Sequence, residues 1–237
     1  PSPLNHLDIL DKIEAILPSL LQKIQNGGSQ TSLESLTQQF RDQYAQQPLT
    51  FGGSTSCVEL KTESARIILD AGSGLKQLGN QVLATSDKNN KIYLLLSHHH
   101  WDHICGFPFF APAFFPNFEI KIFHPAYDRL KQPEKLLTYQ QKAPFFPVQF
   151  DKLGAKISFH GFSEWDLEDV DIKVLKLNHP NNAFGYKIEH KNKIVTYCTD
   201  TELTEARKSE LKKYSDFMRN SNVAIVDSQY DFIETYN

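Results

Sequence analysis

Apolar and polar residues alternate in short runs along most of the chain from residue 57 onward. Runs of about four to eight residues rich in β-branched and aromatic side chains are typical of β-strands. The segment Glu189-His190-Lys191-Asn192-Lys193 lies between two such runs and predicts a hairpin turn. The predicted strands are Cys57–Leu60, Arg66–Asp70, Lys91–Ser97, Glu119–Phe123, Lys156–Phe159, Val170–Leu177, Phe184–Glu189, Ile194–Thr199 and Val223–Asp227.

Segments with apolar residues at helical spacing lie between several of these strands. The predicted helices are Gly74–Gly79, Tyr127–Lys142 and Glu202–Arg219. Strands that alternate with helices predict an α/β fold built on two mixed sheets with helices outside. No internal repeat and no second domain boundary is visible, so we expect a single domain over residues 1–237.

The N-terminal segment has a different, purely helical pattern. Seven apolar residues between Leu7 and Ile24 recur at helical spacing and predict a helix over Asn5–Gln25, with a kink or break at Pro18. Thr31-Ser32-Leu33-Glu34 has the spacing of a capping box and predicts a second helix that runs to Tyr44. We therefore expect a helical hairpin insertion over residues 5–45. Its apolar stripe could pack on the domain, form a dimer contact or cap the active site.

Bulk properties narrow the class of protein. With 237 residues, 40% of them hydrophobic and 22% charged, the chain is expected to fold around one large core in solution. It contains no apolar run of about 18 residues, so no membrane-spanning helix is expected. The net charge of −3 argues against binding nucleic acid through bulk electrostatics. Three cysteines without a pairing pattern predict free thiols and a cytoplasmic location.

Metal-binding side chains cluster directly after one apolar run. His98, His100, Asp102 and His103 follow Leu94-Leu95-Leu96 within a few positions. Imidazole and carboxylate ligands together suit zinc, iron or manganese. Alternate residues of a strand lie on one face, so one metal could take His98 and His100 and a second could take Asp102 and His103. The alternatives are a fortuitous histidine-rich loop and a single structural metal.

This motif resembles the metal-binding sequence of the metallo-β-lactamase fold superfamily. Further segments, in the same order and with similar spacing, resemble the superfamily from about Phe51 to the C-terminus. The resemblance is to the ribonuclease Z-like and cyclic-nucleotide phosphodiesterase-like branch, and it implies a four-layer α/β/β/α sandwich. The segments are Phe51–Leu60, Ile68–Gly74, Leu177-Asn178-His179-Pro180 and Tyr197–Glu202.

The resemblance also implies a set of metal ligands and two divalent ions, zinc by preference, with manganese or iron as alternatives. His98, His100 and His179 would bind the first metal, Asp102 and His103 the second, and Asp200 both. Asp102 and Asp200 are therefore the predicted catalytic residues. A further histidine ligand is expected after Asn237, and Pro1-Ser2-Pro3 resembles the tail of a turn that begins the family's fold, so we expect the sequence to be incomplete at both ends.

Two ligand positions bear on the reaction. The commonest zinc β-lactamases have cysteine where Asp200 lies, whereas phosphodiesterases, lactonases and glyoxalase II-like enzymes have aspartate. His100 lies where oxygen-reducing diiron relatives have glutamate. A carboxylate that binds two dications offsets part of their charge, and water between them can then react near neutral pH. Cys198, two residues before Asp200, is not expected to be a ligand.

Residues around the motif suggest supporting roles. Asp70 is expected either to orient a metal-bound histidine or to serve only the glycine-rich turn that follows it. His99 should point to the opposite strand face from its neighbours. The aromatic run 107–118 follows the ligands, and its phenylalanines either form core or an interface or offer faces for a nucleobase. They are Phe107, Phe109, Phe110, Phe114, Phe115 and Phe118.

Together these features predict a dinuclear metal-dependent hydrolase, specifically a phosphodiesterase that acts on cyclic nucleotides or related small phosphodiesters. The alternatives are a lactone or thioester hydrolase of the same fold and a metal-bound sensor without turnover. Transfer-RNA processing is not expected, because the chain shows no long inserted basic arm. The expected partner is a small phosphodiester rather than nucleic acid or a membrane, and a homodimer remains open.

Overall fold

The computed structural model describes residues 53–85, 89–127, 132–202 and 208–226, together with Pro18 and Gln22. The chain divides into two units, residues 1–53 and 54–237. The predicted helical hairpin over residues 5–45 lies outside the described residues, apart from Pro18 and Gln22, which are helical and exposed. The prediction of a single domain over the whole chain stays a prediction.

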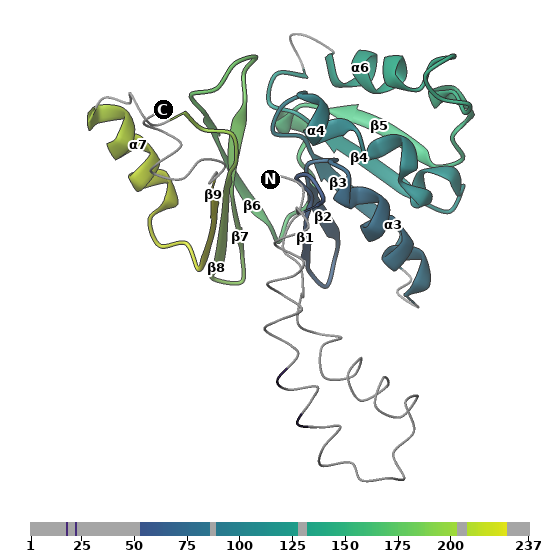
Figure 1. Cartoon of the computed structure of the whole chain (residues 1–237). Coiled ribbons are helices and arrows are strands. Elements are labelled where there is room, and N and C mark those ends of the chain that lie inside the picture. Colours follow the sequence, from purple (N-terminus) through teal and green to yellow (C-terminus); the bar gives the residue numbers. More distant parts are fainter. Residues whose placement is uncertain are drawn as a thin grey trace. The chain divides into compact units, whose positions relative to one another are not determined.

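The second unit contains two mixed β-sheets (Figure 1). In the first sheet β1 is antiparallel to β2, and the remaining neighbours are parallel. In the second sheet β6, β7 and β8 are antiparallel, and β9 is parallel to β8. The first comprises β1 (Val58–Lys61), β2 (Arg66–Leu69), β3 (Lys91–Leu95), β4 (Glu119–Phe123) and β5 (Lys156–His160) in that order; the second comprises β6 (Asp171–Lys176), β7 (Phe184–His190), β8 (Lys193–Cys198) and β9 (Val223–Val226).

Alternation along the strands buries both faces of the first sheet. One face packs against α3 (Gly74–Ala84) and α6 (Gln132–Gln140). The opposite face carries Tyr93, Leu95 and Phe123, which pack against Tyr186 and Tyr197 of the second sheet. The outer face of the second sheet is covered by α7 (Lys208–Met218) through Tyr214. The predicted four-layer α/β/β/α sandwich is therefore confirmed.

The predicted strands and the hairpin at Lys191 and Asn192 are present, with strand ends shifted by at most two residues. The prediction for α3 was too short, because Gly79 was taken as its end. A side chain at Gly79 would approach a ring atom of Phe110 to 2.9 Å, so this glycine permits close packing and does not end the helix. Asp102 and His103, predicted to lie in a turn, belong to a short helix α4 (Trp101–Ile104).

Short 3-10 helices shape the connections between the longer elements. They are η2 (Phe107–Phe109), η3 (Ala111–Phe114), η4 (Phe150–Lys152) and η5 (Phe162–Glu164). The first two lie in the aromatic run that follows the metal motif. All three cysteines are free, as predicted. Among the described residues, no helix is long and apolar enough to cross a membrane.

Candidate metal centre

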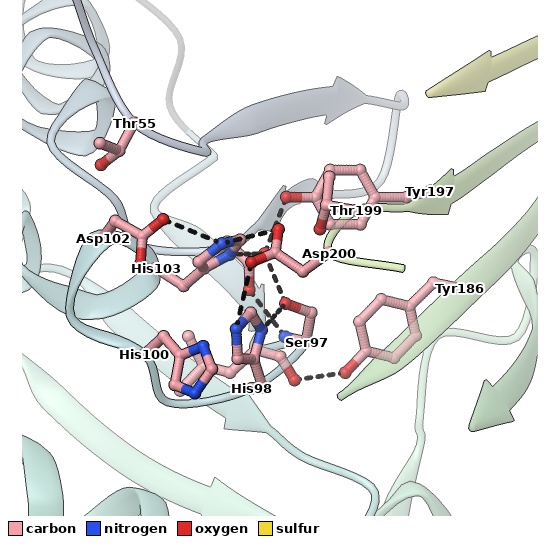
Figure 2. A network of polar contacts seen from close by, with 12 residues as sticks. Thr55, Ser97, His98, His100, Asp102, His103, Tyr186, Tyr197, Thr199 and Asp200 are labelled. Carbon is pink, nitrogen blue, oxygen red and sulfur yellow. Dashed lines mark hydrogen bonds and ion pairs between the residues drawn. The ribbon is translucent and has the colours of Figure 1, made fainter. Parts of the chain in front are cut away.

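The predicted site residues lie where strands of both sheets end. Asp70 follows β2, His98 and His100 follow β3, His179 follows β6, and Asp200 follows β8. Figure 2 shows the side chains of His98, His103 and Asp200 pointing toward one another; His103 comes from the short helix α4, and the other two follow strands. Asp70 and Asp200 both have a positive φ, 61° and 51°, which aspartate tolerates better than most residues.

The six predicted ligands form two groups that share one residue. His98, His100, His179 and Asp200 each offer a ligand atom, and these atoms lie within 4.8 Å of one another. The same holds for Asp102, His103 and Asp200. We call these sets the first and the second donor group. The structure thus brings together all six residues that the sequence predicts as ligands; their ligand role stays a prediction.

Asp200 faces the two groups with different oxygens. Its Oδ2 lies 3.5 Å from Nε2 of His98 and 3.7 Å from Nε2 of His179, both in the first group. Its Oδ1 lies 3.2 Å from Nε2 of His103 in the second group. Asp102 completes the second group, with its Oδ2 3.4 Å from the same His103 nitrogen. A carboxylate in this position can bind two cations, one through each oxygen.

The chemistry of the first group fits a divalent cation. Nε2 of His98 is buried and has no hydrogen-bond partner among the described residues, which is costly unless something else occupies its lone pair. Burial lowers the pKa of His98 to about 3, so the imidazole is neutral near pH 7, as a metal ligand must be. Nitrogen and oxygen donors of this kind suit zinc and its first-row neighbours.

Asp70 supports the second group through His103. It is fully buried, and its Oδ2 lies 2.7 Å from Nδ1 of His103 and accepts hydrogen bonds from the hydroxyls of Ser97 and Tyr197. Burial alone would lower the pKa of His103, but its hydrogen bonds with Asp200 and Asp70 raise that pKa to about 10. His103 thus carries a proton on both nitrogens near pH 7; a cation in the second group would displace the proton on Nε2, and Asp70 would keep the one on Nδ1.

Close backbone contact places Asp70 next to His103. The backbone N–H of Ala71 donates to the carbonyl of His103, and the N–H of Gly106 donates to the carbonyl of Ala71, both at 2.8 Å. A side chain at Gly72 would come within 2.4 Å of the Asp102 carbonyl oxygen, and one at Gly106 within 1.9 Å of the Gly72 carbonyl oxygen. These two glycines allow the turn after β2 to touch α4.

Each of the other three imidazoles also has a partner on its second nitrogen. Nδ1 of His98 lies 3.0 Å from the Ser97 hydroxyl. Nε2 of His100 lies 3.1 Å from the side-chain amide of Asn181, and Nδ1 of His179 lies 3.4 Å from a carboxylate oxygen of Glu202. The sequence did not indicate Ser97, Tyr197 or Glu202 as supporting residues. A polar serine at the buried end of an apolar strand is the one signal that could have revealed Ser97.

Other candidates lie away from the two groups. His99 points to the opposite side from His98, as predicted, and its ring packs against His124 at 4.4 Å. Cys198 packs with Leu175 and Tyr214 beneath α7, and burial raises the pKa of its thiol to about 11. Asp227, the last residue of the predicted strand Val223–Asp227, lies outside the described residues.

The phenylalanines of the aromatic run 107–118 divide into a buried set and an exposed set. Phe107, Phe110 and Phe118 are buried in the core, whereas Phe109, Phe114 and Phe115 are exposed. Trp101, between His100 and Asp102 in the chain, is 64% exposed. Trp101 thus has an exposed indole, and its chain neighbours are one predicted ligand of each donor group.

Comparison with known proteins agrees with this geometry. Residues 65–233 match the family model described as the Beta-lactamase superfamily domain. The chain belongs to the metallo-β-lactamase fold superfamily. No curated protein matches the sequence.

Several solved structures are similar to this chain at low sequence identity. A protein of unknown function from Enterococcus faecalis V583 has a TM-score of 0.50 and 15% identity, with 74% of this chain and 47% of that chain covered. A diphosphatase of the PhnP family gives 0.49 and 14%, with 72% and 59% covered. The metallo-β-lactamase fold protein YhfI from Bacillus subtilis gives 0.49 and 20%, with 73% and 66% covered. This chain spans less than two thirds of each of these proteins.

Proposed function

We propose that this protein is a dinuclear metal-dependent hydrolase that cleaves small phosphodiesters, with cyclic nucleotides among its substrates. Membership of a fold superfamily that consists mostly of metal-dependent hydrolases supports the general class. The observation that carries the dinuclear proposal is the position of Asp200, whose two oxygens face two separate donor groups.

The residues of the centre have distinct tasks in this proposal. His98, His100 and His179 would hold one ion, Asp102 and His103 the other, and Asp200 both. Two divalent ions, zinc or alternatively manganese or iron, would supply an activated water and offset the negative charge that develops on the phosphate oxygens. Asp102 is about half exposed, so solvent and substrate reach the centre on its side. Asp70 keeps the His103 proton on the nitrogen that faces away from the centre.

The proposed preference for nucleotides is supported by Trp101. Its exposed indole adjoins two ligand residues in the chain, and stacking of a base on an aromatic side chain contributes about 1–3 kcal/mol. We expect Trp101→Ala to raise KM about tenfold for a phosphodiester that carries a base or aryl group, since about 1.4 kcal/mol corresponds to tenfold. A dialkyl phosphodiester is the matched control and should show an unchanged KM. Equal loss for both substrates would contradict stacking.

The experiment that tests the proposal combines metal analysis with hydrolysis of bis(p-nitrophenyl) phosphate by the natural full-length protein. Two metals per chain, with turnover abolished by Asp200→Ala, would support it. Two metals without phosphodiester turnover would favour lactone or thioester hydrolysis, because the same centre can act on a carbonyl. One metal or none would favour a sensor without turnover.

A cytoplasmic location is part of the same proposal. The three cysteines are free, and burial raises the pKa of the Cys57 thiol to about 12, so this side chain stays a neutral thiol. Free thiols are typical of proteins in a reducing compartment.

A further inference from the structure

One loop supplies both a predicted ligand and the partner of another ligand. The connection between β6 and β7 contains His179 of the first donor group and, two residues later, Asn181. Nε2 of His179 lies 3.0 Å from Nδ1 of His100, and the amide of Asn181 lies 3.1 Å from Nε2 of the same ring. His100 is thus held between two side chains of this loop.

The two nitrogens of His100 have different surroundings. Nδ1 faces His179 and therefore the first donor group, so Nδ1 is the nitrogen that would bind a cation. A neutral imidazole that offers the lone pair of Nδ1 carries its proton on Nε2, and this N–H needs an acceptor. In the structure the amide nitrogen Nδ2 of Asn181 lies 3.1 Å from Nε2, and half a rotation of this amide brings its oxygen Oδ1 to the same place.

We propose that Asn181 is a positioning residue that accepts the Nε2 hydrogen of His100 through its Oδ1 and so directs the Nδ1 lone pair at the first metal. The proposal rests on the proposed metal centre, but it does not depend on which ester is cleaved. Hydrogen bonds of this kind fix the tautomer and the orientation of a ligating ring, and their loss typically weakens metal binding about 10–100-fold.

The backbone explains why asparagine suits this place. Asn181 and Asn182 both have a φ of 62°, in the left-handed region that asparagine adopts more readily than most residues. Asn182 makes no hydrogen bond to any other part of the chain that the structure describes, whereas Asn181 contacts His100. The two neighbours therefore share the same backbone conformation and differ in their contact with the centre. They form a matched pair for substitution.

The test is a titration with zinc alone, in competition with a chromophoric chelator. It compares Asn181→Leu, Asn182→Leu and Asn181→Asp, each in an Asp102→Ala background that removes a donor of the second group only. Leucine is close in size to asparagine but accepts no hydrogen bond, and both leucine variants carry the same left-handed strain. Aspartate keeps an acceptor at the same position.

We expect Asn181→Leu to weaken zinc binding about 10–100-fold. Asn182→Leu should stay within about threefold of the parent, and Asn181→Asp should bind at least as tightly as the parent, because a carboxylate is the stronger acceptor. Equal affinity of the two leucine variants would overturn the assignment. So would an Asn181→Asp variant as weak as Asn181→Leu. In the protein with Asp102 intact, zinc binding without phosphodiester turnover would overturn the proposed function and leave this assignment supported, whereas no zinc binding by that protein would overturn both.

Discussion

His98 and His99 are neighbours in the chain. Both have a buried ring nitrogen and a lowered pKa, but their rings contact different groups. Each has a buried Nε2 without a hydrogen-bond partner in the described part of the chain, and burial lowers the pKa of His98 to about 3 and that of His99 to about 4. Nε2 of His98 faces Asp200, with the rings of three other histidines close by. The ring of His99 packs instead against His124, whose own Nε2 also lacks a partner among the described residues.

The difference shows that an unpaired buried nitrogen and a shifted pKa do not by themselves identify a metal ligand. What distinguishes His98 is the convergence of donors from other strand ends, especially Asp200 after β8. The extended backbone after β3 produces this outcome, because consecutive side chains point to opposite sides. One residue of register thus separates a predicted ligand from a half-buried histidine that packs against His124.

The largest expected effect comes from substituting these two neighbours in the same way. We expect His98→Gln to empty the first donor group and to lower phosphodiester hydrolysis about 10³-fold, because metals supply several kcal/mol of transition-state stabilisation. His99→Gln should keep both metals and stay within about tenfold of normal turnover. Metal analysis and initial rates decide between them, with far-ultraviolet circular dichroism as the control for folding. Equal metal loss in both variants would contradict the comparison.

The same contrast explains what could be predicted from the sequence. The common side of His98 and His100 follows from an apolar strand and its alternation, whereas Asp102 and His103 lie in the short helix α4 and join the predicted ligands through the family resemblance. The partner of His100 could not be predicted, because Asn181 reaches it only through a loop with two consecutive left-handed residues. Such a loop conformation leaves no periodic pattern in the sequence.

Gly79 and Asp70 show a similar limit of prediction from the sequence. Gly79 was taken as the end of a helix, because glycine destabilises a helix interior. The position instead depends on a tertiary contact with Phe110 that no local pattern encodes. Likewise, Asp70 could be assigned to a strand end, but its contacts with Ser97, His103 and Tyr197 join residues up to 127 positions apart. Long-range pairing of this kind is decided by the assembled sheets.

A smaller effect is expected from Asp70→Asn. This substitution tests whether metal binding by the second donor group depends on the buried contact between Asp70 and His103. Asparagine fits the φ of 61° at this position, but it removes the negative charge and replaces one acceptor oxygen with an NH2 donor. The pKa of His103 should fall from about 10, and zinc affinity of the second group should fall about 10–100-fold. A two-step zinc titration measures both groups in one experiment. A loss at the first group as large as that at the second would argue that Asp70 supports the whole centre.

The smallest expected effect concerns His124, whose ring packs against that of His99. Burial, with the nearby His99 and His98, lowers the pKa of His124 to about 3, whereas an unfolded histidine has a pKa of about 6.5. Between these values the unfolded chain binds a proton that the folded chain does not, so the free energy of unfolding decreases as the pH falls below about 6.5. His124 contributes at most about 1.4 kcal/mol per pH unit to this decrease.

His124→Asn should therefore reduce the acid sensitivity of the protein. Asparagine does not titrate, and its side-chain oxygen can replace Nδ1 as the acceptor for the backbone N–H of Ala126. Urea unfolding at about pH 7.5 and about pH 4.5, above and below the pKa at which the unfolded histidine gains its proton, measures the change in the free energy of unfolding. A chelator-treated sample run in parallel shows whether the effect of His124→Asn depends on bound metal. The His124 share should be the same with and without metal, since His124 belongs to neither donor group. If metal removal abolished the difference between His124→Asn and the parent, His99 and His124 would be coupled to the metal centre.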